Sequence, residues 1–171
     1  MPVNRGKDFE KIIGEAFREV PNTSVYRLYD TMGGYSGIAN VSDFIIYKKP
    51  YQYFIECKSV KGNTLSISGN DPKRKYGMIS NTQWDGMLEM SKVDGVYAGV
   101  ICWWTERDVT AFLPIQLLNE LYNTWHKSIR YDFDIDEMTK DFVLDAPVFR
   151  LNAQKKRVFF DYDMRDFFAR F

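Results

Sequence analysis

A charged pair inside an apolar stretch constrains this chain more than any other feature of its sequence. The run from Tyr51 to Ser59 is mostly apolar, yet it contains Glu56 and Lys58. Alternate side chains of a strand share one face, so these two side chains would point the same way. Burying charges in such a strand is costly unless they are paired or serve a function. We therefore expect a strand that carries a polar site on one of its faces.

A second acid stands at the start of the neighbouring apolar run. Asp43 directly precedes residues 44–47, and the Lys48-Lys49-Pro50 segment is a turn signal that would fold this run back beside the Glu56 strand. Two carboxylates and the Lys58 ammonium would then converge. The sequence therefore predicts one small site built from two acids and a lysine.

Such a site suits phosphodiester hydrolysis assisted by a divalent cation. Mg²⁺ prefers oxygen ligands, so Asp43, Glu56 and the backbone carbonyl of Cys57 are the expected metal ligands, and Mn²⁺ is expected to substitute for Mg²⁺. Lys58 would orient or deprotonate the attacking water, or stabilise the transition state. A Glu-x-Lys pair is also common as a purely structural surface pair, but Asp43 upstream and Gln83 downstream favour a catalytic site.

Hydrophobic periodicity predicts the surrounding elements. Apolar residues recur at three- and four-residue steps between Phe9 and Val20, which predicts a helix ended by Pro21. The continuous apolar run 96–104 is typical of a central strand buried on both faces. The other expected elements are strands at 25–29, 109–113 and 157–160 and helices at 81–93 and from Pro114 through Tyr122. Together they indicate an α/β fold with a mixed central sheet flanked by helices.

Length and charge narrow the classes of protein that fit. With 171 residues, 45% of them hydrophobic, the chain can bury one substantial core, and we expect a single domain over residues 1–171. Its 23 basic residues equal its 23 acidic ones, whereas duplex-binding proteins usually carry a basic excess. Basic clusters at 73–75 and 155–157 and acidic segments at 132–137 and 161–163 would allow a basic face and an acidic back. Charge runs of this kind are also typical of plain solvated surface.

No apolar run is long enough to span a bilayer, and the first residues lack the hydrophobic segment of a secretion signal. We therefore expect a cytoplasmic protein with no membrane partner. Cys57 and Cys102 lie in strand-like runs without metal-ligand spacing, which predicts buried, reduced thiols. His126 is the single histidine, so a histidine-based nucleophile relay or a zinc cluster is excluded.

Short motifs follow one another along the chain in a set order: Asn4-Arg5-Gly6, Glu10, Asp43, Glu56-Cys57-Lys58, Thr82-Gln83 and Lys127-Ser128-Ile129-Arg130. This series resembles the RecU-type Holliday junction resolvases of Gram-positive bacteria and their phages, and a phage version fits it best. These enzymes belong to the PD-(D/E)xK nuclease superfamily. The resemblance covers most of the chain, from Asn4 to about Arg130.

The resemblance implies a restriction-endonuclease-like core and a magnesium-dependent homodimer that cuts four-way DNA junctions by paired symmetrical nicks. Branched DNA would be the substrate, and host or phage recombination proteins would be further partners. Its catalytic set corresponds here to Glu10, Asp43, Glu56 and Lys58. Gln83 would orient the site or contact phosphate, or be an ordinary residue at a helix start. The expected DNA contacts are Arg5, Lys61, Lys73, Arg74, Lys75, Tyr35 and Arg130, of which Arg5 could equally be solvated.

Two departures from the family pattern bear on the substrate. Ser42 stands where the superfamily name has proline, although the carboxylate of Asp43 is intact. The segment between Glu10 and Asp43 is shorter than in the cellular RecU proteins, so a loop at 30–40, with Tyr35 and Ile38, would either probe the junction or be a plain loop. Two rivals therefore stay open: a PD-(D/E)xK nuclease that cuts duplex or flap DNA, and a recombination factor that binds branched DNA without cutting it.

Overall fold

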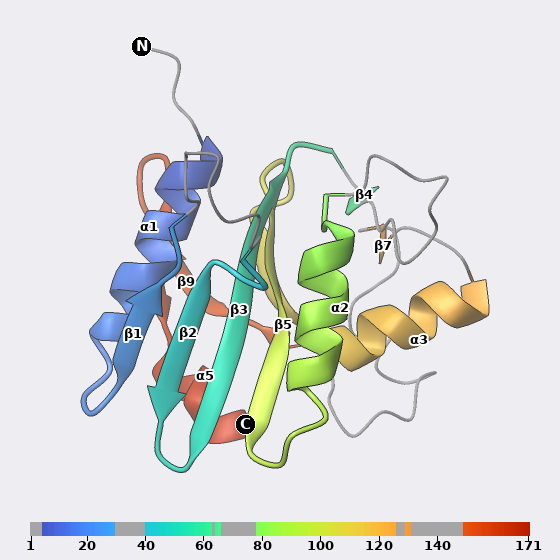
Figure 1. Cartoon of the computed structure of the whole chain (residues 1–171). Helices are drawn as coiled ribbons and strands as arrows, with labels where there is room; N and C mark the ends of the chain where they lie inside the picture. The colour runs from blue at the N-terminus through green and yellow to red at the C-terminus, as the bar shows by residue number, and fades with distance from the viewer. Residues whose placement is uncertain (1–4, 30–39, 63, 66–77, 126–128, 131–148) are drawn as a thin grey trace.

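The computed structural model describes residues 5–29, 40–62, 64–65, 78–125, 129–130 and 149–171. Figure 1 shows the arrangement of the helices and strands along the chain. In chain order these are α1 (Arg5–Arg18), β1 (Ser24–Arg27), β2 (Phe44–Lys48), β3 (Tyr51–Val60), β4 (Thr64–Leu65), α2 (Asn81–Met90), β5 (Val96–Trp104), β6 (Val109–Pro114), α3 (Ile115–Trp125), β7 (Ile129–Arg130), β8 (Phe149–Arg150), β9 (Asn152–Lys155), β10 (Phe160–Asp163) and α5 (Arg165–Arg170).

A six-stranded mixed sheet forms the centre, in the order β1-β2-β3-β5-β6-β8. Strands β1, β2 and β3 form an antiparallel meander, and β5 runs parallel to β3 after the crossover through α2. Strand β6 then returns antiparallel to β5. The expected α/β class with a mixed, helix-flanked sheet is confirmed, including the turn between β2 and β3 and the buried central position of β5.

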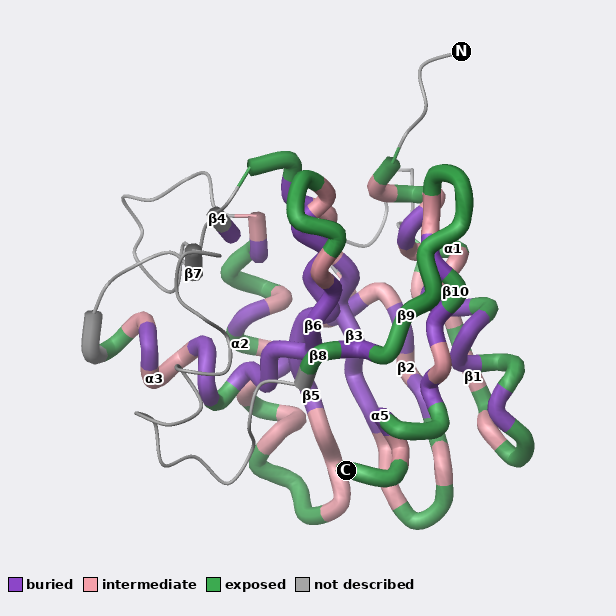
Figure 2. The backbone as a smooth tube through the Cα atoms, turned by 180° about the vertical axis from the view of Figure 1, so that it is seen from behind, coloured by how far each residue is buried: buried purple, intermediate pink, exposed green. Residues whose placement is uncertain are grey.

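The sheet has a separate core on each face. Residues Tyr53, Ile55 and Cys57 of β3 pack in the core that also contains the apolar side of α1 and Phe167 of α5. Phe54 of β3 belongs to the other core, which also contains residues of α2 and α3. Figure 1 shows α2 and α3 on one side of the sheet, and Figure 2 shows the central strands buried between the layers. The alternation along β3 therefore directs Glu56 toward the α2 side.

The N-terminal helix forms because its apolar side chains gather on one side. Phe9, Ile13 and Phe17 are fully buried, and their spacing follows the helical repeat. Gly14 lies against the ring of Phe44, where a Cβ atom would come within 2.8 Å of the ring. This close approach holds α1 on the start of β2 and brings its first turns to the end of the sheet that carries Asp43.

The boundaries differ from the sequence expectation at several points. The first helix begins at Arg5 and ends at Arg18, and the helix expected at 81–93 ends at Met90. The strand expected at 157–160 is wrong, because all but Phe160 of it lies in the connection between β9 and β10. Every residue of β9 is exposed, so its sequence lacks the apolar alternation by which a strand is recognised.

Both cysteines are buried and free, as expected. Among the helices that the structure describes, none is long and apolar enough to cross a membrane.

Candidate active site

The starts of α1 and α2 and the C-terminal end of β3 lie at the same end of the molecule, the upper end in Figure 1. The β2–β3 register pairs Phe44 with Ile55, which sets Asp43, one residue earlier, opposite Glu56. The backbone N–H of Asp43 donates to the carbonyl of Ile55 (3.1 Å), and the carbonyl of Asp43 accepts from the N–H of Leu28 (2.8 Å). Two neighbouring strands thus fix the backbone of Asp43.

The carboxylate of Asp43 lies beside the backbone of β3. Its Oδ2 accepts a hydrogen bond from the backbone N–H of Cys57 at 2.7 Å. The N–H and C=O of one strand residue point to the same side of the strand, so the carbonyl of Cys57 also lies on the Asp43 side. The Cys57 side chain is directed elsewhere, into the core beside α1. A carboxylate oxygen of Asp43 and the carbonyl oxygen of Cys57 therefore lie on the same side of β3.

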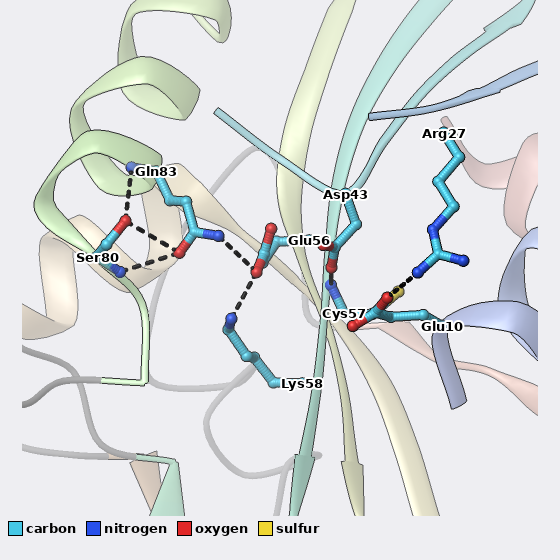
Figure 3. A network of polar contacts seen from close by, with 8 residues as sticks. All are labelled: Glu10, Arg27, Asp43, Glu56, Cys57, Lys58, Ser80 and Gln83. Carbon is cyan, nitrogen blue, oxygen red and sulfur yellow. Dashed lines mark hydrogen bonds and ion pairs between the residues drawn. The ribbon is translucent and has the colours of Figure 1, made fainter. Parts of the chain in front are cut away.

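Glu56 is the most deeply buried charged residue of the site, with 1% of its surface exposed. Its Oε1 accepts from Lys58 Nζ at 2.5 Å and from Gln83 Nε2 at 2.7 Å. Its Oε2 is buried and has no hydrogen-bond partner among the described residues. The prediction that Glu56 and Lys58 share a face is confirmed. Figure 3 shows Glu56 between Lys58 and Gln83.

Burial makes the ionised forms of both carboxylates unfavourable. It raises the pKa of Glu56 to about 7, with the Asp43 charge adding to the effect and Lys58 and Gln83 opposing it. It also raises the pKa of Asp43 to about 6; the hydrogen bond from Cys57 opposes this rise, and the charge of Glu10 adds to it. Burial has the largest single effect on the pKa of Lys58 and lowers it, but the charge and hydrogen bond of Glu56 together with the charge of Asp43 outweigh burial, so the net shift is upward. Two such carboxylates gain strongly from a cation between them.

The donor set fits Mg²⁺ in chemistry. The unpartnered Oε2 of Glu56, the Asp43 carboxylate and the Cys57 carbonyl are all oxygen donors, as this hard cation prefers. The described residues contain no group of three or more His, Cys, Asp or Glu side chains placed to hold a metal. The candidate set therefore consists of two side chains and one backbone group, and Mg²⁺ commonly keeps several waters in such sites.

Glu10 approaches from the opposite face of the sheet. It extends from α1, and its Oε2 forms an ion pair with Nη2 of Arg27 at 2.5 Å, with both side chains about three-quarters buried. Figure 3 shows Glu10 and Arg27 on the other side of β3 from Glu56, Lys58 and Gln83. Glu10 is near enough for its charge to raise the pKa of Asp43. The structure thus brings Glu10 to the site but pairs it with an arginine.

Arg27 is a site residue that the sequence analysis missed. It ends β1 and pairs in register with Phe44, next to Asp43, whose pKa its charge lowers. A signal was present, because Arg27 is the only charged residue in the strand expected at 25–29. A lone charge within a strand of this kind is the same anomaly that singled out Glu56.

Gln83 lies at the start of a helix and also contacts Glu56. It occupies the third position of α2, where it forms a capping box with Ser80, and its amide also reaches Glu56. Helix α2 can lie this close because residue 86 is glycine. A Cβ atom there would come within 2.4 Å of the side chain of Val41.

The expected DNA-contacting residues are only partly described. Arg5 begins α1 and Lys61 directly follows β3; both are exposed, at the end of the sheet that carries the site. Arg130 lies in β7, where it pairs with Thr64 of β4. Tyr35, Lys73, Arg74 and Lys75, together with all but the last residue of the loop expected at 30–40, lie outside the described residues.

Comparisons with known proteins add little to this geometry. No protein-family model and no curated protein matches the chain. Among solved structures, the chain is similar to Hjc, a Holliday junction resolvase of Archaeoglobus fulgidus, with 18% sequence identity and a TM-score of 0.46. The match covers 65% of this chain and 78% of the archaeal one. The functional assignment therefore rests on the site itself.

Proposed function

We propose that this protein is a magnesium-dependent endonuclease that resolves four-way DNA junctions by paired symmetrical nicks, acting as a homodimer. One observation carries the nuclease assignment. Glu56 is buried with Oε1 held by Lys58 and Gln83 and Oε2 unpartnered, while the carboxylate of Asp43 lies across the strand register from it. An arrangement that costs stability in the absence of a ligand is typical of a functional site.

In this proposal, Asp43, Glu56 and the carbonyl of Cys57 hold Mg²⁺. When bound, the ion neutralises the two carboxylates, polarises the scissile phosphate and lowers the pKa of a water. Lys58 extends from the same face as Glu56 and places its ammonium beside that carboxylate, where it can orient the attacking water or stabilise charge that develops on the phosphate. Mn²⁺ is expected to replace Mg²⁺ because it accepts the same oxygen ligands.

Glu10 and Arg27 form the opposite wall of the proposed site. Their ion pair places the guanidinium group of Arg27 near Asp43, where its positive charge offsets part of the negative charge of the two acids. We propose that Glu10 supports the metal site from this side and that Arg27 keeps its carboxylate in place. Gln83 holds Glu56 through its amide.

The preference for junctions is the finer part of the proposal, and the ordered series of motifs from Asn4 to Arg130 supports it. Arg5 and Lys61 add exposed positive charge at the end that carries the site, where phosphates of branched DNA would bind. A duplex or flap nuclease would use the same chemistry. A factor that only binds would have no need of a buried Asp43, Glu56 and Lys58 site.

The test compares a synthetic four-way junction with linear duplexes and a flap of the same arm sequences, in Mg²⁺ and in EDTA. Symmetrical nicks in the junction, with the linear DNA left intact, are expected in Mg²⁺ only. Equal cutting of all substrates would instead establish the duplex or flap nuclease, and tight binding without cutting would establish the non-cleaving factor. Sedimentation at micromolar concentration should show a dimer, since paired nicking needs two active sites.

A further inference from the structure

Ser80 contacts the side-chain amide of Gln83 from the side opposite Glu56. The hydroxyl of Ser80 donates to Oε1 of Gln83 at 3.2 Å, and the backbone N–H of Ser80 donates to the same oxygen at 3.0 Å. The hydroxyl oxygen also accepts from the backbone N–H of Gln83 at 3.2 Å. On its other side, Nε2 of Gln83 donates to Oε1 of Glu56 at 2.7 Å. Figure 3 shows this chain of contacts from Ser80 to Glu56.

Only one orientation of the Gln83 amide satisfies these partners. With the amide turned over, its NH₂ group would face the backbone N–H of Ser80, which can only donate, and its oxygen would face the Glu56 carboxylate, which can only accept when ionised. Both contacts would then become repulsive. The donors on Ser80 therefore decide that Gln83 presents N–H, rather than C=O, to Glu56.

We propose that Ser80 is a positioning residue for the metal site, an inference that rests on the proposed function. Ser80 holds the oxygen of the Gln83 amide, which fixes the N–H of that amide on Oε1 of Glu56. Glu56 thereby keeps one rotamer, with Oε1 occupied by Gln83 and Lys58 and Oε2 available to a cation. Outer hydrogen bonds of this kind orient metal-binding carboxylates and set their affinity.

Ser80 is also the N-cap of α2, so a purely structural role has to be separated from the positioning role. Threonine and glycine are about equally good N-cap residues, but only threonine has a hydroxyl. Ser80→Thr and Ser80→Gly therefore form a matched pair with similar effects on the helix. Both keep the backbone N–H donor to Oε1 of Gln83, and only Ser80→Gly removes the hydroxyl donor. Ser91→Gly is a further control, because it removes a hydroxyl that caps the other end of α2 and contacts Leu88 rather than the site.

The experiment measures the affinity of each variant for Mg²⁺ and Mn²⁺ by calorimetry, its single-turnover rate of junction nicking, and its urea stability. The ¹⁵N-labelled side-chain amide of Gln83, identified by its loss in Gln83→Met, reports the hydrogen bond in metal-free protein. We expect Ser80→Thr and Ser91→Gly to stay within about threefold of the unsubstituted protein in metal affinity. Ser80→Gly should lose about tenfold, and its Gln83 amide protons should exchange faster with solvent.

The outcomes separate the two proposals. If Ser80→Thr and Ser80→Gly bind metal and nick equally well, Ser80 only caps the helix and the inference is wrong, whatever the protein cuts. If the unsubstituted protein binds no divalent cation and cuts no DNA, the proposed function fails. The amide exchange of Gln83 then still shows whether the Ser80 hydroxyl orients that side chain.

Discussion

Replacing Glu56 by glutamine should stabilise the metal-free protein while removing its proposed activity. Glutamine keeps the oxygen that accepts from Lys58 and Gln83, so the packing and these two contacts survive the change. What disappears is a buried negative charge close to Asp43. Sites of this kind commonly trade stability for function.

The magnitude follows from the pKa of Glu56. Its rise from 4.5 to about 7 corresponds to roughly 3 kcal/mol of unfavourable free energy for the ionised form, at about 1.4 kcal/mol per pKa unit. The attraction of Lys58 is already included in this pKa. The NH₂ group that glutamine places at the buried, unpartnered Oε2 position offsets part of the gain. We therefore expect Glu56→Gln to raise the free energy of unfolding by about 2 kcal/mol at pH 8 in EDTA.

The difference in free energy of unfolding between Glu56→Gln and the unsubstituted protein should grow as the pH rises. Because the pKa of Glu56 is higher in the folded protein than its ordinary value, the folded state binds more protons between pH 4.5 and about 7. The stability of the unsubstituted protein therefore falls as the pH rises through this range, and the variant lacks this part of the fall. At pH 5 the difference between the two proteins should be less than about 1 kcal/mol.

Urea unfolding in EDTA at pH 5 and pH 8 measures this difference, with Glu89→Gln as the control. Glu89 lies on the exposed side of α2 and forms an ion pair with exposed Lys92, so its substitution should change stability by less than about 0.5 kcal/mol. Added Mg²⁺ should then stabilise the unsubstituted protein more than Glu56→Gln. A variant that is equally stable or less stable at pH 8 would refute the assignment of a strained, buried Glu56 carboxylate.

Three further substitutions test other parts of the site. Gly86→Ala should lower the free energy of unfolding by about 1–3 kcal/mol in urea and slow nicking, because the new Cβ would collide with Val41 and displace α2; unchanged stability would contradict this packing. Arg27→Gln should raise the pKa of Asp43 above its value of about 6, since the charge of Arg27 lowers that pKa. A carbon-detected NMR titration in EDTA measures this pKa, and an unchanged value would mean that the charge of Arg27 does not act on Asp43. Lys58→Met should abolish nicking in the gel assay and leave junction binding intact, and nicking that persists would exclude Lys58 from the chemistry.

The sequence predicts how Asp43, Glu56 and Lys58 are brought together, because the placement of these side chains depends on short-range rules. Strand alternation decides which side chains share a face, and one turn brings the two acids together. The central position of β5 also follows from a local signal, since its sequence has the continuous apolar pattern of a strand buried on both faces. The pairing of Glu10 with Arg27 depends instead on how α1 lies against β1, which no local pattern encodes.

The least predictable parts are those whose residues are polar or whose partners are distant in sequence. Strand β9 is exposed throughout and exists because it pairs with β10, so hydrophobic periodicity could not find it. The short helix α5 is held by the contacts of Phe167 with Phe17 and Phe112, which lie far away in the chain. The contact of the Gln83 amide with Glu56 likewise joins the start of α2 to β3 across 27 residues.

The most direct test of the central claim is the cleavage of a four-way junction by the unsubstituted protein and by Asp43→Asn, in Mg²⁺ and in EDTA. The claim predicts paired nicks by the unsubstituted protein in Mg²⁺ only, and a loss of about 10³-fold in the cleavage rate of Asp43→Asn, equivalent to about 4 kcal/mol of transition-state stabilisation. Junction affinity measured in EDTA should be equal for both proteins. Cleavage by Asp43→Asn at an undiminished rate, or cleavage by either protein in EDTA, would contradict a metal-dependent site at Asp43 and Glu56.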